Sequence, residues 1–134
     1  MRNILLTFLF FCSLSACKQS PIRQSFSSTD SLVIHFKDEQ AGTVTKTVQT
    51  AESNAINRMI DFIDAKETVQ FKCGNDGKMF FYNKGQKIQE VDFKMKNDSC
   101  NHFAFLINGK LTSTKMSNEA IDFLNALEQG MPYY

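Results

Sequence analysis

Short segments in which apolar and polar residues alternate, separated by turns that contain glycine, fill most of the chain between residues 32 and 115. Successive side chains of a strand point to opposite faces, so alternation with a period of two predicts strands that bury one face. The predicted strands cover residues 32–36, 43–49, 68–73, 78–82, 89–95, 101–107 and 110–115. Asn108-Gly109 and Asn75-Asp76-Gly77 have the composition of tight turns in which the glycine takes a positive φ. Hairpin connections of this kind predict an antiparallel sheet.

Two further segments carry apolar residues at helical spacing, one between residues 53 and 64 and one between Ser117 and Gly130. Their apolar stripes are Ile56, Met59, Ile60 and Ile63 in the first segment, and Ile121, Leu124 and Leu127 in the second. The predicted element order is therefore ββ-α-βββββ-α. This order predicts an α+β domain over residues 31–134, with an antiparallel sheet of about six to seven strands and both helices on one face.

The N-terminus has the layout of an export signal. Arg2 precedes an apolar run, residues 4–11, that is too short to span a bilayer as a helix. Leu14-Ser15-Ala16-Cys17 follows and resembles the lipobox of bacterial lipoproteins, a resemblance that covers the first 17 residues. It implies that residues 1–16 are a signal peptide, and that Cys17 becomes the lipid-modified N-terminus. The alternative is an ordinary secretory signal in which Cys17 has no role.

The resemblance implies a protein anchored in a membrane of the bacterial cell envelope by the lipid on Cys17, without spanning that membrane. Lys18, which stands where many inner-membrane lipoproteins have Asp, favours the outer membrane and leaves the face undetermined. The serine-rich residues 17–30 are expected to form the lipidated end and a flexible tether that holds the domain on the order of 20 Å from the membrane. The near balance of 15 basic and 14 acidic residues argues against a nucleic-acid partner.

Cys73 and Cys100 are the thiols that remain after export and lipidation. An even pair in an exported protein predicts a disulfide, here with a structural role. A second interpretation pairs Cys100 with His102 as nucleophile and base, or adds Cys73 to form part of a metal site. That interpretation has little support in the sequence, because a Cys-x-His pair alone lacks the further ligands or positioning groups that such sites use.

The sequence contains no Gly-rich phosphate loop, no Gly-x-Ser-x-Gly and no His-Glu-x-x-His motif, so we expect no catalytic residue, metal or cofactor. One feature favours binding. If the helices cover one face of the sheet, the other face is expected to expose aromatic and apolar residues among lysines: Tyr82, Phe81, Leu106 and His102. The alternative is that the first hairpin or a second subunit covers them. The predicted function is a non-enzymatic binding or accessory module, such as an envelope subunit, an inhibitor or an immunity-type protein, whose partner is another envelope protein or a glycan. The alternative function is a thiol- or metal-dependent activity at Cys100 and His102.

Overall fold

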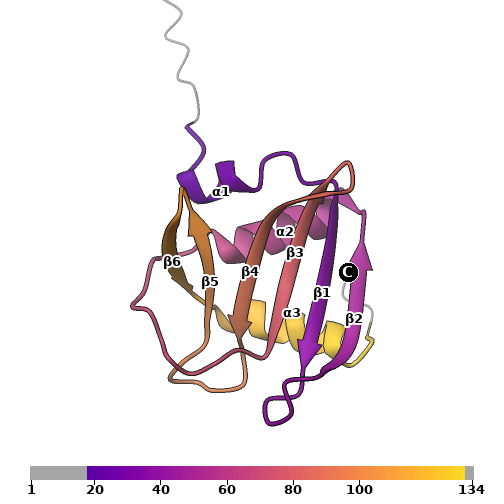
Figure 1. The fold of residues 1–134 in the computed structure, drawn as a ribbon, viewed down its shortest axis with the longest axis vertical. Coiled ribbons are helices and arrows are strands. Elements are labelled where there is room, and N and C mark those ends of the chain that lie inside the picture. Colours follow the sequence, from indigo (N-terminus) through magenta and orange to yellow (C-terminus); the bar gives the residue numbers. More distant parts are fainter. Residues whose placement is uncertain (1–17, 132–134) are drawn as a thin grey trace, which may run out of the picture.

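The computed structural model describes residues 18–131, so the predicted signal peptide and Cys17 lie outside the described residues (Figure 1). Its elements are, in order, α1 (Pro21–Ser25), β1 (Ser31–Lys37), β2 (Val44–Thr50), α2 (Ser53–Ile63), β3 (Gly77–Asn83), β4 (Gln86–Lys94), β5 (His102–Ile107), β6 (Lys110–Lys115) and α3 (Asn118–Glu128). Within this range, no helix has the combination of length and apolar content that crossing a membrane requires.

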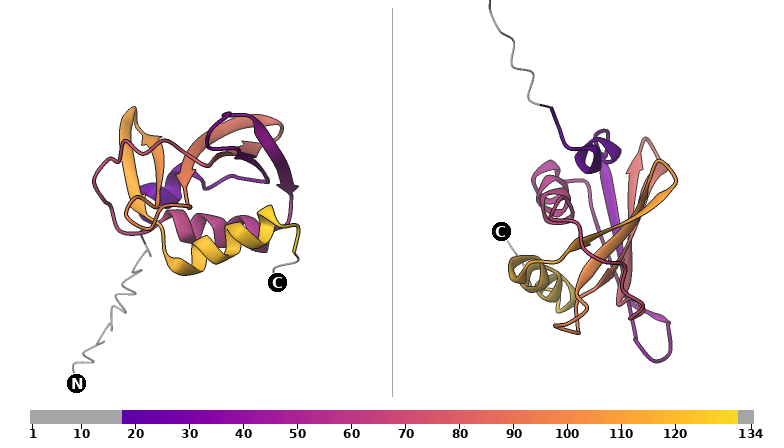
Figure 2. Two further views of the ribbon diagram at one scale, coloured as in Figure 1. Left: turned by 90° about the horizontal axis from the view of Figure 1, so that it is seen from below. Right: turned by 90° about the vertical axis from the view of Figure 1, so that its left-hand side faces the viewer.

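The six strands form one sheet in the order β2-β1-β3-β4-β5-β6, and every neighbouring pair is antiparallel. The two longer helices, α2 and α3, lie side by side on the same face of the sheet, and no helix of residues 18–131 lies over the other face (Figure 2). This arrangement confirms the predicted α+β class.

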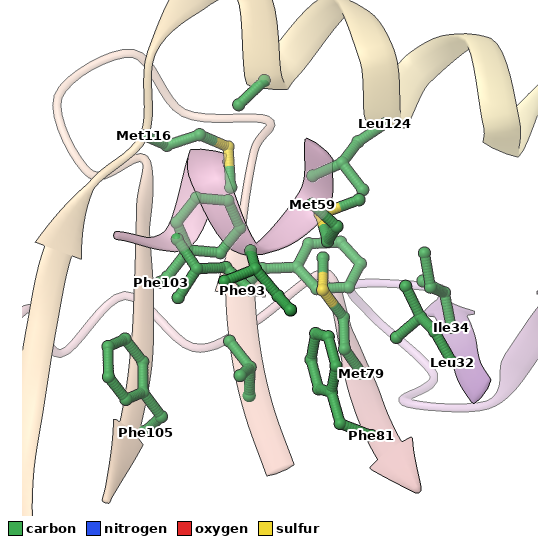
Figure 3. Packing of buried hydrophobic residues seen from close by; sticks show 14 of the residues in the cluster. Leu32, Ile34, Met59, Met79, Phe81, Phe93, Phe103, Phe105, Met116 and Leu124 are labelled. Atoms are coloured by element: carbon green, nitrogen blue, oxygen red, sulfur yellow. The ribbon is translucent and has the colours of Figure 1, made fainter. Parts of the chain in front are cut away.

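The core lies between the sheet and the helices. Every second strand residue points into it, as the burial of Leu32, Ile34 and Phe36 on β1 shows. The apolar stripe of α2 belongs to the same core cluster, together with Phe123 and Leu124 of α3. Figure 3 shows Met59 and Leu124 packed over the strand side chains. Full burial of such side chains stabilises the fold by about 1.5–3 kcal/mol each.

Residues 68–73 were predicted as a strand, and this prediction is wrong. They form an irregular segment, whose backbone pairing with the sheet is limited to the hydrogen bond from Thr68 N–H to Ser113 O, next to an isolated bridge between Glu67 and Thr114. Val69 has 69% of its surface exposed, so the alternating pattern here does not correspond to a buried face. The sheet therefore has four strands after α2, and six in total.

The prediction of a flexible tether is wrong for the residues after Ser20. Ser20 caps α1 by accepting a hydrogen bond from the Arg23 amide at 3.0 Å. Ile22 and Phe26, four residues apart, are buried in the core, where the Phe26 ring lies 4.7 Å from that of Phe81. The domain thus begins at α1, before the predicted boundary at residue 31.

The predicted turn at residues 75–77 also takes a different form. The positive φ belongs to Gly74, at 71°, while Gly77 begins β3. A Cβ at Gly77 would collide with the Phe93 ring and with the carbonyl oxygen of His35, so close packing is what requires glycine there.

Candidate binding site

The structure does not bring the predicted surface residues together on an exposed face. Phe81 has no exposed surface, because its side chain points to the helices and lies in the core (Figure 3). His102 faces the other side but has only 5% of its surface exposed, since the Phe71 ring packs against it. Tyr82 is half-buried, and Leu106 alone is well exposed, at 55%. The prediction of an exposed site is therefore wrong for Phe81 and His102.

The middle of the helix-free face is polar. Lys78 Nζ donates to Glu90 at 2.6 Å and lies 3.5 Å from Asp92, and Lys87 Nζ donates to the second oxygen of Glu90 at 2.8 Å. The hydrogen bonds from Lys78 and Lys87 lower the pKa of Glu90, and the hydrogen bond to Glu90 raises the pKa of Lys78. Lys78 and Lys87 are thus paired with Glu90, while Asp92 Oδ1 is buried without a hydrogen bond from any described residue. The middle of this face is therefore a poor contact surface for an apolar partner.

The Cys73–Cys100 disulfide predicted from the sequence is present and joins the irregular segment to the start of β5. His102 Nδ1 donates to the carbonyl oxygen of Cys100 at 2.6 Å, and its ring is buried beneath Phe71. With the Cys100 sulfur bonded to Cys73, the pair does not form a thiol and base. Residues 18–131 also contain no cluster of three or more side chains of the kind that holds a metal ion.

A crevice with a volume of about 260 Å³ lies elsewhere, between β2 and the two long helices. Its walls are largely apolar. They are formed by Leu32, Ile34, Val48, Ala55, Met59, Phe123, Leu127 and Met131, with Gln49, Thr50 and Glu52 at the polar margin. The crevice forms because β2 is the last strand on its side of the sheet, and the helices extend beneath it without a further strand to close the layer.

On the side away from β1, no strand of the described residues pairs with the backbone of β2. The Lys37 N–H on β1 donates to Asp76 O at 2.8 Å, which shows that odd-numbered residues of β1 bond toward β3. Hydrogen-bonding groups alternate between the two sides of a strand, so the even-numbered residues of β1 bond to β2. Their partners are Lys46, Val48 and Thr50. The peptide groups of Thr47 and Gln49 therefore point outward, and within residues 18–131 no other segment makes a backbone hydrogen bond to them. At Thr45 a shift in the β1–β2 register interrupts the alternation.

The opposite edge of the sheet is different. Lys115 N–H on β6 donates to Lys66 O, and Thr68 N–H donates to Ser113 O, both at 2.9 Å. The segment that was predicted as a strand thus covers part of β6. Of the two edges, β2 is the one that the described chain leaves open.

Two charged residues mark the ends of this edge. Lys46 lies on the helix-facing side of β2, and its ammonium group lies beside Gly130, just past the end of α3. Glu52 lies at the other end, where it precedes α2. Neither makes an ion pair with another residue of the described chain. A ligand along β2 therefore meets a cation, an apolar crevice and an anion in that order.

The sequence analysis missed this site. The β-branched strand at residues 43–49 was predicted, but which strand lies at the edge depends on β3 pairing with β1, and no local pattern indicates that pairing. Comparisons of the chain with models of protein families, with curated proteins and with solved structures find no match. The geometry of the site is thus the basis for a functional proposal.

Proposed function

We propose that this protein is an exported, lipid-anchored binding module of the bacterial cell envelope, without enzymatic activity, that binds an extended segment of another envelope protein along β2. The signal sequence and Cys17 support the anchor, and Lys18 favours the outer membrane. The observation that carries the binding proposal is the apolar crevice beside the unpaired edge of β2.

An extended peptide beside β2 gains two kinds of interaction. Its backbone pairs with the outward peptide groups of Thr47 and Gln49, which gives affinity with little dependence on sequence. Neighbouring residues of paired strands share a face, so the peptide residue opposite Val48 places its side chain toward the crevice. That side chain supplies specificity.

The charges at the two ends of β2 define the class of segment further. A peptide with an acidic residue near Lys46, an apolar residue opposite Val48 and a basic residue near Glu52 complements the site. The inward position of Lys46 also makes pairing with an arbitrary strand unfavourable, because an uncompensated charge would then be covered. A matching acidic residue removes that cost.

Photo-crosslinking tests the proposal. Benzoylphenylalanine in place of Gln49, in full-length protein exported by cells, identifies the segment that lies beside β2, and a synthetic peptide of that segment is then titrated. Thr47→Pro removes an outward N–H that the β1–β2 ladder does not use, so the variant should fold and bind the peptide at least about tenfold more weakly. Thr47→Ala keeps the N–H and serves as the matched control with unchanged binding.

Three results would count against the proposal. One is a crosslinked peptide whose affinity is the same for Thr47→Pro and Thr47→Ala. Another is the absence of any crosslink at Gln49. The third is a crosslink only to a second copy of the chain, together with a dimer in light scattering, because self-association would then explain the open edge.

A further inference from the structure

The distance between the anchor and the folded domain is short. Only Lys18 and Gln19 separate Cys17 from Ser20, which caps α1 and also donates to Asp64 of α2 at 2.8 Å. One residue spans at most about 3.6 Å, so Cys17 lies within roughly 11 Å of Ser20. A lipid on Cys17 therefore holds the α1 end of the domain close to the membrane surface.

Several other segments meet at this end of the molecule (Figure 1). The turn between β3 and β4 is tied to the chain that follows α1, because the Lys84 N–H donates to Asp30 at 2.8 Å. The turn between β5 and β6 lies there as well. A groove of about 540 Å³ runs between α1 and these strands, and its lining includes Pro21, Gln24, Ile88 and Leu106.

Apolar side chains are exposed at the same end. Among the described residues, six large apolar side chains are exposed, and three of them lie on β4, β5 and β6: Ile88 at 37%, Leu106 at 55% and Leu111 at 44%. Leu106 and Leu111 are direct cross-strand neighbours on the helix-free face. They form an exposed apolar pair beside the groove.

Both signs of charge are present at this end, and three lysines are left without ion pairs. Lys18, Lys84 and Lys110 are exposed, and none of them makes an ion pair within residues 18–131. Arg23 is paired with both Asp61 of α2 and Asp64 just after it, so this group carries one negative charge in excess, and the exposed Asp30 carboxylate lies beside the Lys84 N–H. The combination of unpaired lysines with exposed Leu and Ile is typical of surfaces that lie on an anionic bilayer.

We propose that the α1 end of the domain lies directly on the bilayer, with Ile88, Leu106 and Leu111 at the boundary of headgroups and acyl chains and Lys18, Lys84 and Lys110 over anionic headgroups. This inference rests on the lipid anchor of the proposed function. The opposite end of the domain faces away from the membrane, and the turn between β1 and β2, with Asp38 and Glu39, lies at that end.

Site-specific fluorescence on the natively lipidated protein tests this orientation. The protein is reconstituted in vesicles of phosphatidylethanolamine and phosphatidylglycerol, with an environment-sensitive dye on a cysteine at one of three exposed positions. Gln24→Cys and Leu106→Cys place the dye at the α1 end, and Val44→Cys places it at the start of β2, as the matched control. We expect a blue shift and quenching by spin-labelled lipid at positions 24 and 106, with neither at position 44.

Charge supplies a second readout. Lys84→Gln with Lys110→Gln should lower the equilibrium constant for contact by roughly thirtyfold, seen as lost quenching at position 24, because each lysine near an anionic surface contributes about 1 kcal/mol. The same loss is expected for the unchanged protein in vesicles of phosphatidylcholine alone.

Flotation with the vesicles separates the two ways in which the inference can fail. Protein that floats, but whose dye at positions 24 and 106 behaves as at position 44, overturns the orientation and leaves the anchor intact. Protein that does not float, and whose mass shows no acyl chains on Cys17, overturns the anchor and the orientation with it.

Discussion

The Asp76 carboxylate accepts a hydrogen bond from Lys94 Nζ at 3.1 Å, in a position where both side chains are sealed from solvent. Asp76 also accepts the amide N–H groups of Met95 and Lys96, at 2.7 and 2.9 Å. Lys94 Nζ donates in addition to the exposed Glu39 at 2.6 Å. Burial lowers the pKa of Lys94, but the hydrogen bonds to Glu39 and Asp76 outweigh it, so the pKa is raised and the side chain stays charged.

Loss of Asp76 is expected to destabilise the fold strongly. Asp76→Ala leaves the Lys94 charge and two amides without their buried acceptor, at a cost of about 3–5 kcal/mol in the free energy of unfolding. Glu39→Gln is the control, because Glu39 has 62% of its side chain exposed and should contribute less than about 1 kcal/mol. Urea denaturation measures the loss in the free energy of unfolding for each variant. Equal losses would show that the buried contact between Asp76 and Lys94 stabilises the fold no more than the exposed contact with Glu39.

Removal of the Phe26 ring should reveal whether α1 belongs to the domain. This ring packs edge-on against Phe81 and lies 5.9 Å from that of Phe105, so Phe26→Ala should lower the free energy of unfolding by about 3–5 kcal/mol. Ser28→Ala, at an exposed position in the same segment, should change it little. Identical unfolding curves for the two variants would show that α1 and Phe26 do not stabilise the domain. The segment would then be part of the flexible tether predicted from the sequence.

The disulfide is expected to stabilise the fold through the segment that it restrains. Its cysteines are 27 residues apart, and on the chain-entropy model closing such a loop contributes about 3.5 kcal/mol. In Cys73→Ser with Cys100→Ser, hydrogen exchange should rise first in residues 66–76, while β1 and β3 stay protected. Alkylation of the exported wild-type protein should label both cysteines only after reduction, and labelling without reductant would contradict the bond.

The Lys78–Glu90 pair gives the fold a predictable pH dependence. The lowered pKa of Glu90 means that its stabilising effect is present above the usual value of 4.5 and is lost as the pH falls through the folded-state pKa. The raised pKa of Lys78 acts in the opposite direction, so its effect is lost only as the pH rises beyond 10.5. Glu90→Gln should flatten the acid limb of a stability–pH curve. An unchanged acid limb would show that other carboxylates account for it.

Much of this fold follows from local patterns. The strand predicted at residues 32–36, the turn at Asn108-Gly109 and the helix capped by Ser117 are all present, because each depends on residues close in sequence. The Ser117 side chain accepts a hydrogen bond from the Ala120 amide, as a capping residue does.

Other features could not be predicted from local patterns, because they depend on contacts between residues that are far apart in the sequence. Ile22 and Phe26 form a single buried turn of helix among serines, too short for a periodic signal, and their burial depends on Phe81 and Phe105. Phe71 lies in a stretch of alternating residues that predicts a strand. Its segment does not form a strand of the sheet, and its ring packs against that of His102. The crevice likewise requires the strand order, which sets β2 at the edge beside α2 and α3.

The unequal edges of the sheet limit how many chains can join it. Because residues 66–68 cover part of β6, a strand that adds to β2 finds no equivalent full-length edge on the far side at which a further chain could continue. Head-to-tail addition of copies of the chain, β2 of one against β6 of the next, is therefore unfavourable, and pairing of β2 with β2 closes after two molecules. The open edge of β2 can in this way remain exposed without the chain growing into fibres.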